Sequence, residues 1–555
     1  MTQTLNGTHL RLDGHSLRIA DVVRIARSTV DDSTVELDPA AAVVMDSTVR
    51  RKDDLVAQDL PVYGLTTGFG DSCTRQVAAT RAVALQRHLI LYHLNGVGPQ
   101  TPADVARATV LIRANCLSRG PSAVRPELVR ALLHLLDRQI TPVIPERGSL
   151  GASGDLVPLS YLAAALLGEG EVEHRGVRRP AREALALEGL TPVELAAKEG
   201  LALINGTSFG AAFATVAASD AAELAWVADL ATALTCEVLL GNTSHFAEFI
   251  HASKGHPGQC RSAATIRELL AGSVLTTTYA EILARRDRLD GRDHLILEQR
   301  IQDKYSVRCA PHVNGVLRDT LDWVGPWLER EINSSNDNPL FDPATGELHH
   351  GGNFYAGHVG QAADALKVAV ANLADLLDRQ LALVVDEKFN AGLPANLVDP
   401  TLADRGEANL HHGFKGMQIA CSSVTAEALK LAAPATVFSR STEAHNQDKV
   451  SMATTAAREA RTVVELTQQV AAIHLLALAQ ALDLRGAHDA GPAVRRAHAL
   501  IRERVPFLDR DRRMDHDIHA VVDLIRTGAL RAAVTGHIAP PEIGVPASYT
   551  QTREE

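Results

Sequence analysis

Aromatic residues are scarce in this chain of 555 residues, where they make up only 4%. Sandwiches and barrels of β-strands rely on aromatic and β-branched side chains, so a chain poor in rings and rich in Ala and Leu favours helices. Hydrophobic residues reach 46% and charged residues 22%, ordinary values that exclude a disordered or a collagen-like chain. The composition therefore predicts a mainly α-helical globular protein.

Positive charge is also in short supply, since 55 Lys and Arg stand against 66 Asp and Glu, a net charge of −11. Without a basic surface to neutralise phosphates or an anionic bilayer, the sequence predicts neither a nucleic-acid partner nor a membrane partner. The N-terminus lacks a basic stretch followed by an apolar one, and no run of about 18 apolar residues occurs. We therefore expect a cytoplasmic protein.

Cysteines are few and contain no CxxC pair, which predicts reduced, mostly buried thiols and no zinc site. The 23 histidines do not change this, because no HExxH motif occurs. His88 and His93 are five positions apart and so lie off a common helical face. A metal hydrolase is therefore disfavoured. The six cysteines are Cys73, Cys116, Cys236, Cys260, Cys309 and Cys421.

Two long helices stand out in the hydrophobic pattern. Residues 362–385 place Leu and Val at alternating steps of four and three, which makes one face of a long amphipathic helix. Residues 452–485 contain no Gly or Pro and are apolar or small nearly all round, as expected at the centre of a bundle. Further helices are expected within 103–139, 208–240 and 422–433.

The chain is expected to divide into three parts that share one core. These are an N-terminal cofactor-bearing region at 1–210, a central long-helix bundle at 211–485, and a C-terminal helical cap with a loose tail at 486–555. Residues 251–300 are polar and contain Gly, which predicts loops and short helices. Residues 536–555 contain three prolines, which predicts that the loose tail lies there.

A glycine-rich segment at 146–158, with the sequence ERGSLGASGDLVP, is the first that suggests chemistry. Its glycines permit backbone shapes closed to other residues, and Asp155 is expected to cap the helix that follows. One interpretation is a tight turn or an anion-binding nest. However, the segment fits neither the GxxxxGK[ST] pattern nor the GxGxxG pattern.

The other interpretation is a covalent rearrangement of the backbone. If the chain bends Ala152 back onto Gly154, the Gly154 amide nitrogen can attack the Ala152 carbonyl carbon. Dehydration, including loss of the Ser153 hydroxyl, would leave a five-membered ring that bears a methylidene. Gly is required at the attacking nitrogen because a side chain would crowd the closing ring. A ring just before a helix N-terminus would also accept electron density more readily.

The sequence GSLGASGDL at 148–156 resembles the signature of the histidine, phenylalanine and tyrosine ammonia-lyases and their aminomutase relatives. The resemblance covers about residues 15 to 485. It implies a long helical bundle with a smaller N-terminal portion that bears a 4-methylideneimidazol-5-one (MIO) group, made autocatalytically from Ala152-Ser153-Gly154. It also implies a homotetramer with shared active sites. The further matching segments, in order, are YGLTTGFG, LQRHLILYHLNGVGP, GLALINGTS, QDKYSVR, NSSNDNPLF, GGNFYAGH, GFKGMQ and EAHNQDKVSM.

The same resemblance implies roles for individual residues. Tyr63 is the base that removes the β-proton, Arg308 clamps the substrate carboxylate, and Tyr305 helps proton transfer beside the cofactor. Asn205 hydrogen-bonds the cofactor or the carboxylate, and Phe354 packs against the cofactor. The residues expected to line the amine and carboxylate side are Asn336, Glu443 and Gln447.

Each of these roles has a structural alternative. Tyr63 could be a core tyrosine before a glycine-rich loop, and Arg308 could belong to a structural ion pair. For Asn336, Glu443 and Gln447 the alternative is an ordinary polar group with its hydrogen bonds satisfied.

Tyr92 and His93 are implied to meet the far edge of the substrate ring, where a His accompanies a ring that carries a hydroxyl or is itself an imidazole. A buried His left without a partner costs about 1–3 kcal/mol, so His93 should favour a ring with a polar group. Histidine enzymes of the family carry Glu where this chain has Gln447. The expected order of substrates is tyrosine or a tyrosine-like ring, then phenylalanine, then histidine. Alternatively, His93 bonds a backbone carbonyl and never meets substrate.

Together these features predict a carbon–nitrogen lyase that removes ammonia from an aromatic L-amino acid to give the trans-α,β-unsaturated acid. An aminomutase would use the same site and return the amine to the β-carbon before the product escapes. A noncatalytic helical scaffold would have no use for Ser153, Tyr63 or Arg308, yet all three are present.

Overall fold

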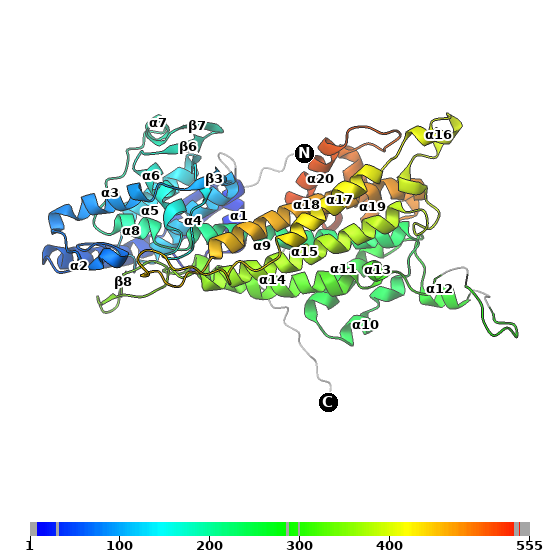
Figure 1. The fold of residues 1–555 in the computed structure, drawn as a ribbon, viewed down its shortest axis with the longest axis horizontal. Coiled ribbons are helices and arrows are strands. Elements are labelled where there is room, and N and C mark those ends of the chain that lie inside the picture. Colours follow the sequence, from blue (N-terminus) through cyan, green and yellow to red (C-terminus); the bar gives the residue numbers. More distant parts are fainter. Residues whose placement is uncertain (1–7, 29–32, 285–287, 298–299, 538–542, 544–555) are drawn as a thin grey trace. The chain divides into compact units, whose positions relative to one another are not determined.

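The computed structural model describes residues 8–28, 33–284, 288–297, 300–537 and 543. Helices dominate these residues (Figure 1), which confirms the predicted fold class. The chain forms two compact units, each built from three segments. Unit 1 comprises Met1–Ser219, Val324–Asp364 and Pro434–Arg461, and unit 2 comprises Asp220–Trp323, Ala365–Ala433 and Thr462–Glu555. The three-part division expected from the sequence stays a prediction.

The first helices of the chain all belong to unit 1. The stretch 103–139, expected to be helical, is two helices, because the chain turns at Gly120, which has φ +98°, and restarts at Pro126 in the first helical position. The helices are α1 (Ile19–Arg27), α2 (Pro39–Ala57), α3 (Ala82–Tyr92), α4 (Ala103–Ser118), α5 (Pro126–Asp137), α6 (Leu156–Leu166), α7 (Ala181–Leu187) and α8 (Glu199–Ile204).

Strands are short in the described residues, and those in unit 1 form small sheets. β1 (Thr8–Leu12) pairs with β2 (Ser33–Leu37) in parallel, with Leu10 opposite Val35. The other pairs are antiparallel. These are β3 (Val97–Gln100) with β5 (Pro145–Arg147), the order β4 (Ile140–Pro142), β6 (Glu171–His174), β7 (Val177–Pro180), and β8 (Leu340–Phe341) with β9 (Leu348–His349). The β3–β5 pair sets the glycine-rich segment beside the loop that follows α3.

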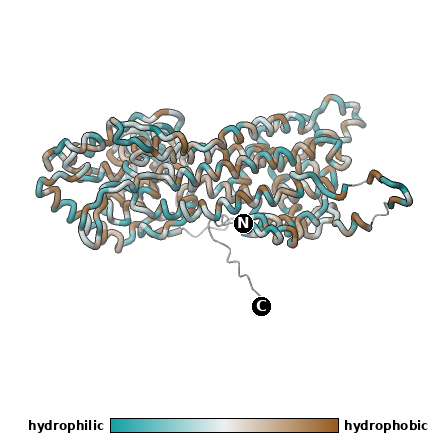
Figure 2. Tube along the Cα trace, turned by 60° about the horizontal axis from the view of Figure 1, so that its bottom comes forward, coloured by the Kyte–Doolittle hydropathy of each residue, from teal (hydrophilic) through white to brown (hydrophobic). Residues whose placement is uncertain are grey.

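Four long helices carry the pattern expected of a bundle. They are α9 (Ser208–Val238), α14 (Ala310–Ile332), α15 (Gly357–Val385) and α18 (Ala453–Arg485). The predicted apolar face of α15 is confirmed, because its members are all buried: Leu366, Val370, Leu373, Leu377, Leu381 and Val384. Figure 2 shows hydrophobic and hydrophilic residues interspersed along the helices.

Two of these helices, α9 and α18, are long and apolar enough to cross a membrane by length and composition. Their most apolar windows of 18 residues are 100% and 78% buried inside the protein. The chain has no unbroken apolar run of that length, because scattered polar residues, such as Thr in both helices and Gln in α18, interrupt them. The burial identifies both as core helices.

The remaining helices lie in unit 2. Residues 251–300 contain short helices and loops, as predicted, except that α11 runs for 14 residues; residues 285–287 and 298–299 lie outside the described residues. The predicted tail at 536–555 also lies outside them, apart from 536, 537 and 543. These helices are α10 (Glu248–Ala252), α11 (Pro257–Leu270), α12 (Tyr279–Ala284), α13 (Tyr305–Arg308), α16 (Thr401–Asp404), α17 (Lys415–Lys430), α19 (Pro492–Arg504), α20 (Asp515–Arg526) and α21 (Ala529–Thr535).

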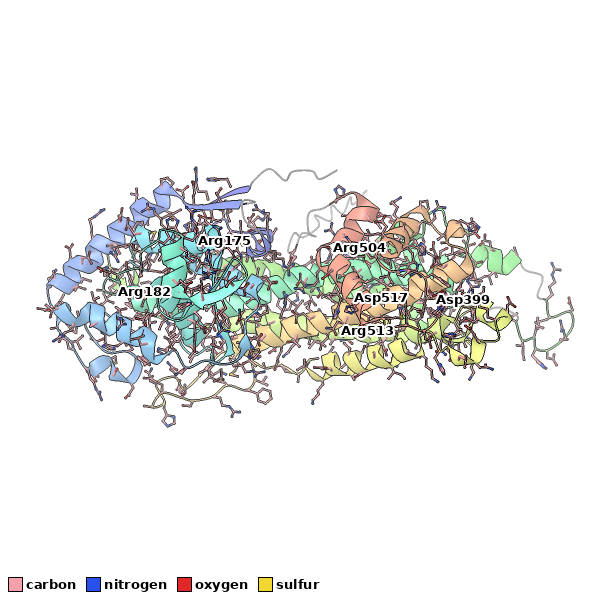
Figure 3. The ribbon with its side chains drawn as sticks, turned by 90° about the horizontal axis from the view of Figure 1, so that it is seen from above. Arg175, Arg182, Asp399, Arg504, Arg513 and Asp517 are labelled. Atoms are coloured by element: carbon pink, nitrogen blue, oxygen red, sulfur yellow. The ribbon has the colours of Figure 1, made fainter. Side chains whose placement is uncertain are left out.

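Charged side chains cover the surface of the C-terminal helices. Arg504 ends α19, and Asp517 lies in the first turn of α20 (Figure 3). Asp517 accepts a hydrogen bond from Arg512 at 2.5 Å. A carboxylate in the first turn of a helix is also favoured by the helix dipole.

Half of the cysteines are buried, fewer than expected from the sequence. Cys116, Cys236 and Cys421 are buried, whereas Cys73 is exposed. All six thiols are free.

Candidate active site

A cavity of about 170 Å³ in unit 1 brings together segments that are far apart in the sequence. Eight of the predicted site residues line it: Tyr63, Tyr92, His93, Ser153, Asn205, Phe354, Glu443 and Gln447. The residues that complete its lining are Phe69, Gly70, Leu89, Leu156, Leu201 and Asn338. Polar groups from several segments therefore converge on one apolar-walled space, the usual character of a small-molecule site.

Ser153 lies at one wall of this cavity, in the loop between β5 and α6. Asn205 Nδ2 donates to the Ser153 carbonyl oxygen at 2.8 Å, and Gln447 Nε2 donates to Ser153 Oγ at 3.1 Å. Gly154 has φ +68°, and a Cβ added there would collide with the backbone of Gly206. Only glycine fits at this position, both for its φ and for the close backbone approach.

Asp155 does not cap α6, so that prediction is wrong. It occupies the N-cap position of α6 but makes no capping hydrogen bond there. Its carboxylate instead accepts hydrogen bonds from the Gly210 amide at 2.8 Å, from Ser149 Oγ at 2.8 Å and from Thr454 Oγ1. Burial raises the pKa of Asp155 although these bonds lower it. The buried carboxylate thereby ties the loop that bears Ser153 to the first turn of α9.

The loop that carries Tyr63 is anchored on both sides of the ring. Val62 and Leu65 are buried in a small apolar cluster with Ala123 and Phe341. These anchors fix the backbone, so the Tyr63 ring is held in the cavity wall. Tyr63 itself is only partly buried and lines the cavity, which differs from the core tyrosine considered as its structural alternative.

The hydroxyl of Tyr63 meets two opposing influences. Tyr63 Oη accepts a hydrogen bond from the Gly70 amide at 2.9 Å, which favours the phenolate. Burial raises the pKa of Tyr63, and the Glu443 carboxylate raises it further. Glu443 Oε1 in turn accepts a hydrogen bond from the Asp71 amide at 2.8 Å, so it also holds the Gly70–Thr74 turn in place.

The turn that presents Glu443 and Gln447 is strained. Glu443, Ala444 and His445 have φ values of +52°, +52° and +63°, in the left-handed region that residues with a side chain rarely adopt. A bridge between Thr442 and Gln447 closes the turn. Such strain concentrates at functional sites because the surrounding structure must enforce it.

His93 directly follows α3, at the C-cap position, and a hydrogen bond indicates which of its ring nitrogens carries the proton. Its Nδ1 lies 2.8 Å from the Leu89 carbonyl oxygen, which can only accept, so Nδ1 carries the proton. Burial lowers the pKa of His93, which favours the neutral ring, and in that form Nε2 is an acceptor. The carbonyl bond of the sequence-based alternative exists, and the ring also lines the cavity, so contact between His93 and substrate stays a prediction. Its neighbour Tyr92 is 58% exposed, and burial of the remainder together with Glu443 raises its pKa to about 12.

Tyr305 and Arg308 lie on α13, within unit 2, and are not among the residues that line the cavity of unit 1. Tyr305 is 72% exposed. The Arg308 guanidinium lies over the Tyr305 ring, 4.6 Å from its centroid, and donates to Gln302 Oε1. The roles expected of these two residues stay predictions.

Residues 17–503 of the chain match the family model for aromatic amino acid lyases. The chain belongs to the aromatic amino acid lyase family. It is 40% identical over 525 residues to a histidine ammonia-lyase of Stigmatella aurantiaca, covering 95% of this chain and 98% of that one. It is 41% identical over 529 residues to a tyrosine ammonia-lyase of Cupriavidus metallidurans, covering 95% and 97%.

Among solved structures, a tyrosine aminomutase from Streptomyces globisporus matches this lyase with a TM-score of 0.90 and 36% identity, over 97% of this chain and 100% of that one. These relatives confirm the resemblance, the fold and the carbon–nitrogen lyase class. They differ in the substrates that their names give, so membership of the family leaves the substrate of this lyase open.

The surroundings of Ala152-Ser153-Gly154 fit the MIO group that the family resemblance implies. Gly154 has no room for a side chain, the Ser153 carbonyl oxygen already receives a hydrogen bond from Asn205, and Gln447 holds the Ser153 hydroxyl. Metal ligands are not part of this arrangement: within the described ranges, no group of three or more His, Cys, Asp or Glu could hold a metal ion.

One polar residue in the cavity wall was not predicted from the sequence. Asn338 lines the cavity, and its backbone amide donates to Asn205 Oδ1 at 2.8 Å. Asn336, the residue expected there, is buried outside the lining, where it accepts from Arg113 at 2.7 Å and donates to Thr207 Oγ1 at 3.0 Å. Both asparagines lie in the segment NSSNDNPLF. The backbone turns between them, so one side chain is buried outside the cavity lining and the other residue lines the cavity.

Proposed function

We propose that this lyase eliminates ammonia from an aromatic L-amino acid, with tyrosine or a tyrosine-like ring favoured, and releases the trans-α,β-unsaturated acid. The observation that carries the proposal is the position of Ser153 between Asn205 and Gln447, in a cavity that Tyr63 and His93 also line.

The reaction needs an electrophile, because the β-proton of such a substrate is barely acidic and an amine is a poor leaving group. The MIO ring formed from Ala152-Ser153-Gly154 would supply an electrophilic methylidene carbon that ordinary side chains lack. Asn205 would hold the oxygen that belongs to Ser153 and withdraw electron density from it, since it already donates there. Gln447 donates to the Ser153 hydroxyl, the group that dehydration would remove, and would hold it while the ring forms.

Tyr63 is the proposed base for the β-proton. The Gly70 amide favours its phenolate, while burial and Glu443 disfavour it, so the ionised fraction depends on the balance between them. Gly64 and Gly70, with φ values of +70° and +54°, give this loop turns that residues with side chains would resist. A loop that closes over bound substrate would exclude water from the reaction.

The substrate preference follows from the acceptor character of His93. A neutral Nε2 suits the hydroxyl of a tyrosine ring, which donates a hydrogen bond, and leaves a bare phenyl ring without a partner for it. Gln447 is neutral where histidine enzymes carry Glu, which weighs against an imidazole substrate. We therefore propose the order tyrosine, phenylalanine, histidine.

An aromatic amino acid 2,3-aminomutase that forms a β-amino acid such as β-tyrosine is the second candidate. It is favoured by the similarity to the tyrosine aminomutase of Streptomyces globisporus. A histidine ammonia-lyase is the third, favoured by the relative from Stigmatella aurantiaca. The same residues would serve the first two reactions, and retention of the unsaturated acid would decide between them.

Incubation of the purified protein with L-tyrosine, L-phenylalanine and L-histidine, each alone, followed by mass analysis, tests the proposal. A lyase gives ammonia and the unsaturated acid, whereas an aminomutase gives an isomer of unchanged mass that chromatography separates. The highest kcat/KM is expected for tyrosine. A higher value for histidine would overturn the substrate order, and the absence of both product types from every substrate would overturn the function.

We also infer a homotetramer whose active sites draw on three subunits, as the family resemblance implies, in the cytoplasm. Large apolar side chains are exposed on three helices of unit 2, with Val316 on α14 at 56%, Val368 on α15 at 45% and Ile419 on α17 at 67%, and subunit contacts would cover them. Light scattering should give a mass near four times 59.4 kDa. A monomer with full activity would contradict this assembly.

A further inference from the structure

A buried polar cluster in unit 2 contacts the turn that carries Tyr305 and Arg308. Its central member is Gln380 of α15, whose side chain is fully buried. Gln380 Nε2 donates to the Ser306 carbonyl oxygen at 2.9 Å and to Thr232 Oγ1 at 3.0 Å. Both hydrogens of the amide are thus used, and one of them holds the backbone of α13.

The second member of the cluster is His474 of α18, which is also fully buried. Its Nε2 lies 3.2 Å from Gln380 Oε1 and 3.1 Å from Thr235 Oγ1. Because the Ser306 carbonyl can only accept, the Gln380 nitrogen must face it and Oε1 must face His474. His474 Nε2 therefore carries the proton and donates.

The direction of every hydrogen bond in the cluster is then fixed. The Thr235 hydroxyl donates to the Ala231 carbonyl at 2.7 Å, so its oxygen is free to accept from His474. Burial lowers the pKa of His474 to about 3, so the ring stays neutral. The single hydrogen on His474 Nε2 is shared between Gln380 Oε1 and Thr235 Oγ1, and the chain of hydrogen bonds runs from His474 through Gln380 to the carbonyl of Ser306.

Packing alone gives no reason for this cluster. His474 Nδ1 is buried and has no hydrogen-bond partner among the described residues, although buried polar groups in native proteins are nearly always paired. Apolar side chains of similar size would fill the same space without an unpaired acceptor. A polar cluster kept under this penalty points to a task beyond stability.

The segment before Arg308 is also held at a second point. The Asn242 amide donates to Asp303 Oδ2 at 2.8 Å, and the Asp303 amide donates to His245 Nε2 at 3.1 Å. With Ser306 held by Gln380, the backbone is fixed on both sides of Tyr305. A short helix of four residues has little stability of its own, so these contacts set its orientation.

Arg308 itself is available for an anion. Its contacts in the described residues are with neutral groups, the Tyr305 ring and Gln302 Oε1, and no carboxylate of the described chain forms an ion pair with it. Its Nε is buried without a partner in the same residues. The structural ion pair considered from the sequence is therefore not seen, and the guanidinium is positioned without being neutralised.

We propose that Gln380 and His474 are positioning residues, which hold the turn at Ser306 so that Arg308 presents its guanidinium to the substrate carboxylate. The inference rests on the proposed function and on the carboxylate-binding role that the family resemblance implies for Arg308. Precise orientation matters for such a group, because a displacement of about 1 Å can reduce activity by about 100-fold.

The test compares a ligand that has a carboxylate with one that lacks it. Gln380→Met removes the hydrogen bonds and keeps an unbranched side chain of similar length. The inhibition constants of trans-4-coumarate and of tyramine are measured for the wild type and the variant, with Tm as a check on folding. We expect Gln380→Met to weaken inhibition by 4-coumarate by about tenfold and inhibition by tyramine by less than about twofold.

Gln480→Met is the matched control. Gln480 is a buried amide on α18 that donates to the Leu508 carbonyl at 3.1 Å and accepts from the Leu508 amide at 3.0 Å, so it does not contact α13. Its replacement should lower Tm and leave the ratio of the two inhibition constants unchanged. If Gln380→Met does not fold, His474→Asn, which is too short to reach Gln380, should shift the ratio in the same direction.

Arg308→Gln separates failure of this inference from failure of the carboxylate-binding role that the resemblance implies for Arg308, and the incubation with the three amino acids tests the proposed function by itself. If Arg308→Gln leaves inhibition by 4-coumarate unchanged, Arg308 does not bind the carboxylate and both proposals about it fall. If Arg308→Gln weakens inhibition while folded Gln380→Met does not, the positioning role alone is overturned. Equal losses for 4-coumarate and tyramine in Gln380→Met would also overturn it, because general damage to the site would explain them.

Discussion

Replacing His93 with Phe should convert a preference for tyrosine into a preference for phenylalanine. The Leu89 carbonyl fixes the proton of His93 on Nδ1, and burial keeps the ring neutral, so Nε2 offers a lone pair to the cavity. A tyrosine hydroxyl can donate to that lone pair, and a bare phenyl ring cannot. His93→Phe removes the acceptor while it keeps an aromatic ring in the wall.

The expected size follows from one unpaired polar group. A buried acceptor without a donor costs about 1–3 kcal/mol, and 1.4 kcal/mol corresponds to about tenfold, so the ratio of kcat/KM for tyrosine over phenylalanine should fall by about 5- to 150-fold. Both parts of the ratio should change: kcat/KM should rise for phenylalanine, because no acceptor is left unpaired, and should fall for tyrosine, because its hydroxyl loses its acceptor.

Steady-state kinetics with both substrates measures this ratio directly. His88→Phe is the matched control, since His88 lies exposed on the same helix and does not line the cavity. Its ratio should stay within about twofold of the wild type. An unchanged ratio in His93→Phe would refute the reasoning and remove His93 from the ring pocket.

Two further predictions concern titrating groups. Burial raises the pKa of Glu237 from 4.5 to about 7, so folding favours its protonated form and the free energy of unfolding falls as pH rises from 4.5 to 7. Glu237→Gln mimics the protonated acid and keeps the acceptor for the Gly491 amide. It should raise the free energy of unfolding by up to about 3 kcal/mol at pH 8 and change it little at pH 4.5. Denaturant titrations at both pH values measure this difference, and an equal change at both would contradict the prediction. Glu443 raises the pKa of Tyr63, so Glu443→Gln should move the rising limb of the pH profile of kcat/KM to lower pH, and a shift to higher pH would exclude Tyr63 as the titrating base.

The long helices could be predicted because their burial is encoded in local spacing. Every position of the apolar face expected within 362–385 is buried in α15. Local spacing was less informative where a helix ends. Ala and Leu continue through 103–139, and the break between α4 and α5 depends on Gly120 and Pro126, which an average over the stretch overlooks.

The assembly of the site could not be derived from local patterns. Gln447 reaches Ser153 across 294 positions, and only the family resemblance relates the two in sequence. Asp155 looks like a helix cap because it directly precedes α6, but two partners of its carboxylate, the Gly210 amide and Thr454 Oγ1, are 55 and 299 positions away in the sequence. Asn336 and Asn338 are two positions apart, yet only Asn338 lines the cavity, because the turn between them sends one side chain into the core.

The support for α13 was equally hidden. Gln380 and His474 lie on helices that bury other polar residues as well, among them Asp378 on α15 and Gln468 on α18, so the sequence does not single them out. Gln380 contacts the Ser306 carbonyl, and His474 contacts Gln380. Every residue has a backbone carbonyl, so the sequence does not show which one a side chain will bind.

The mass of the intact protein tests the central claim most directly. Conversion of Ala152-Ser153-Gly154 to the MIO ring removes two waters, so the native protein should weigh roughly 36 Da less than its encoded sequence. Ser153→Ala should fold, should have the full mass that its own sequence encodes, without this loss of water, and should lose most activity. A fully active protein with the unmodified mass would contradict the account.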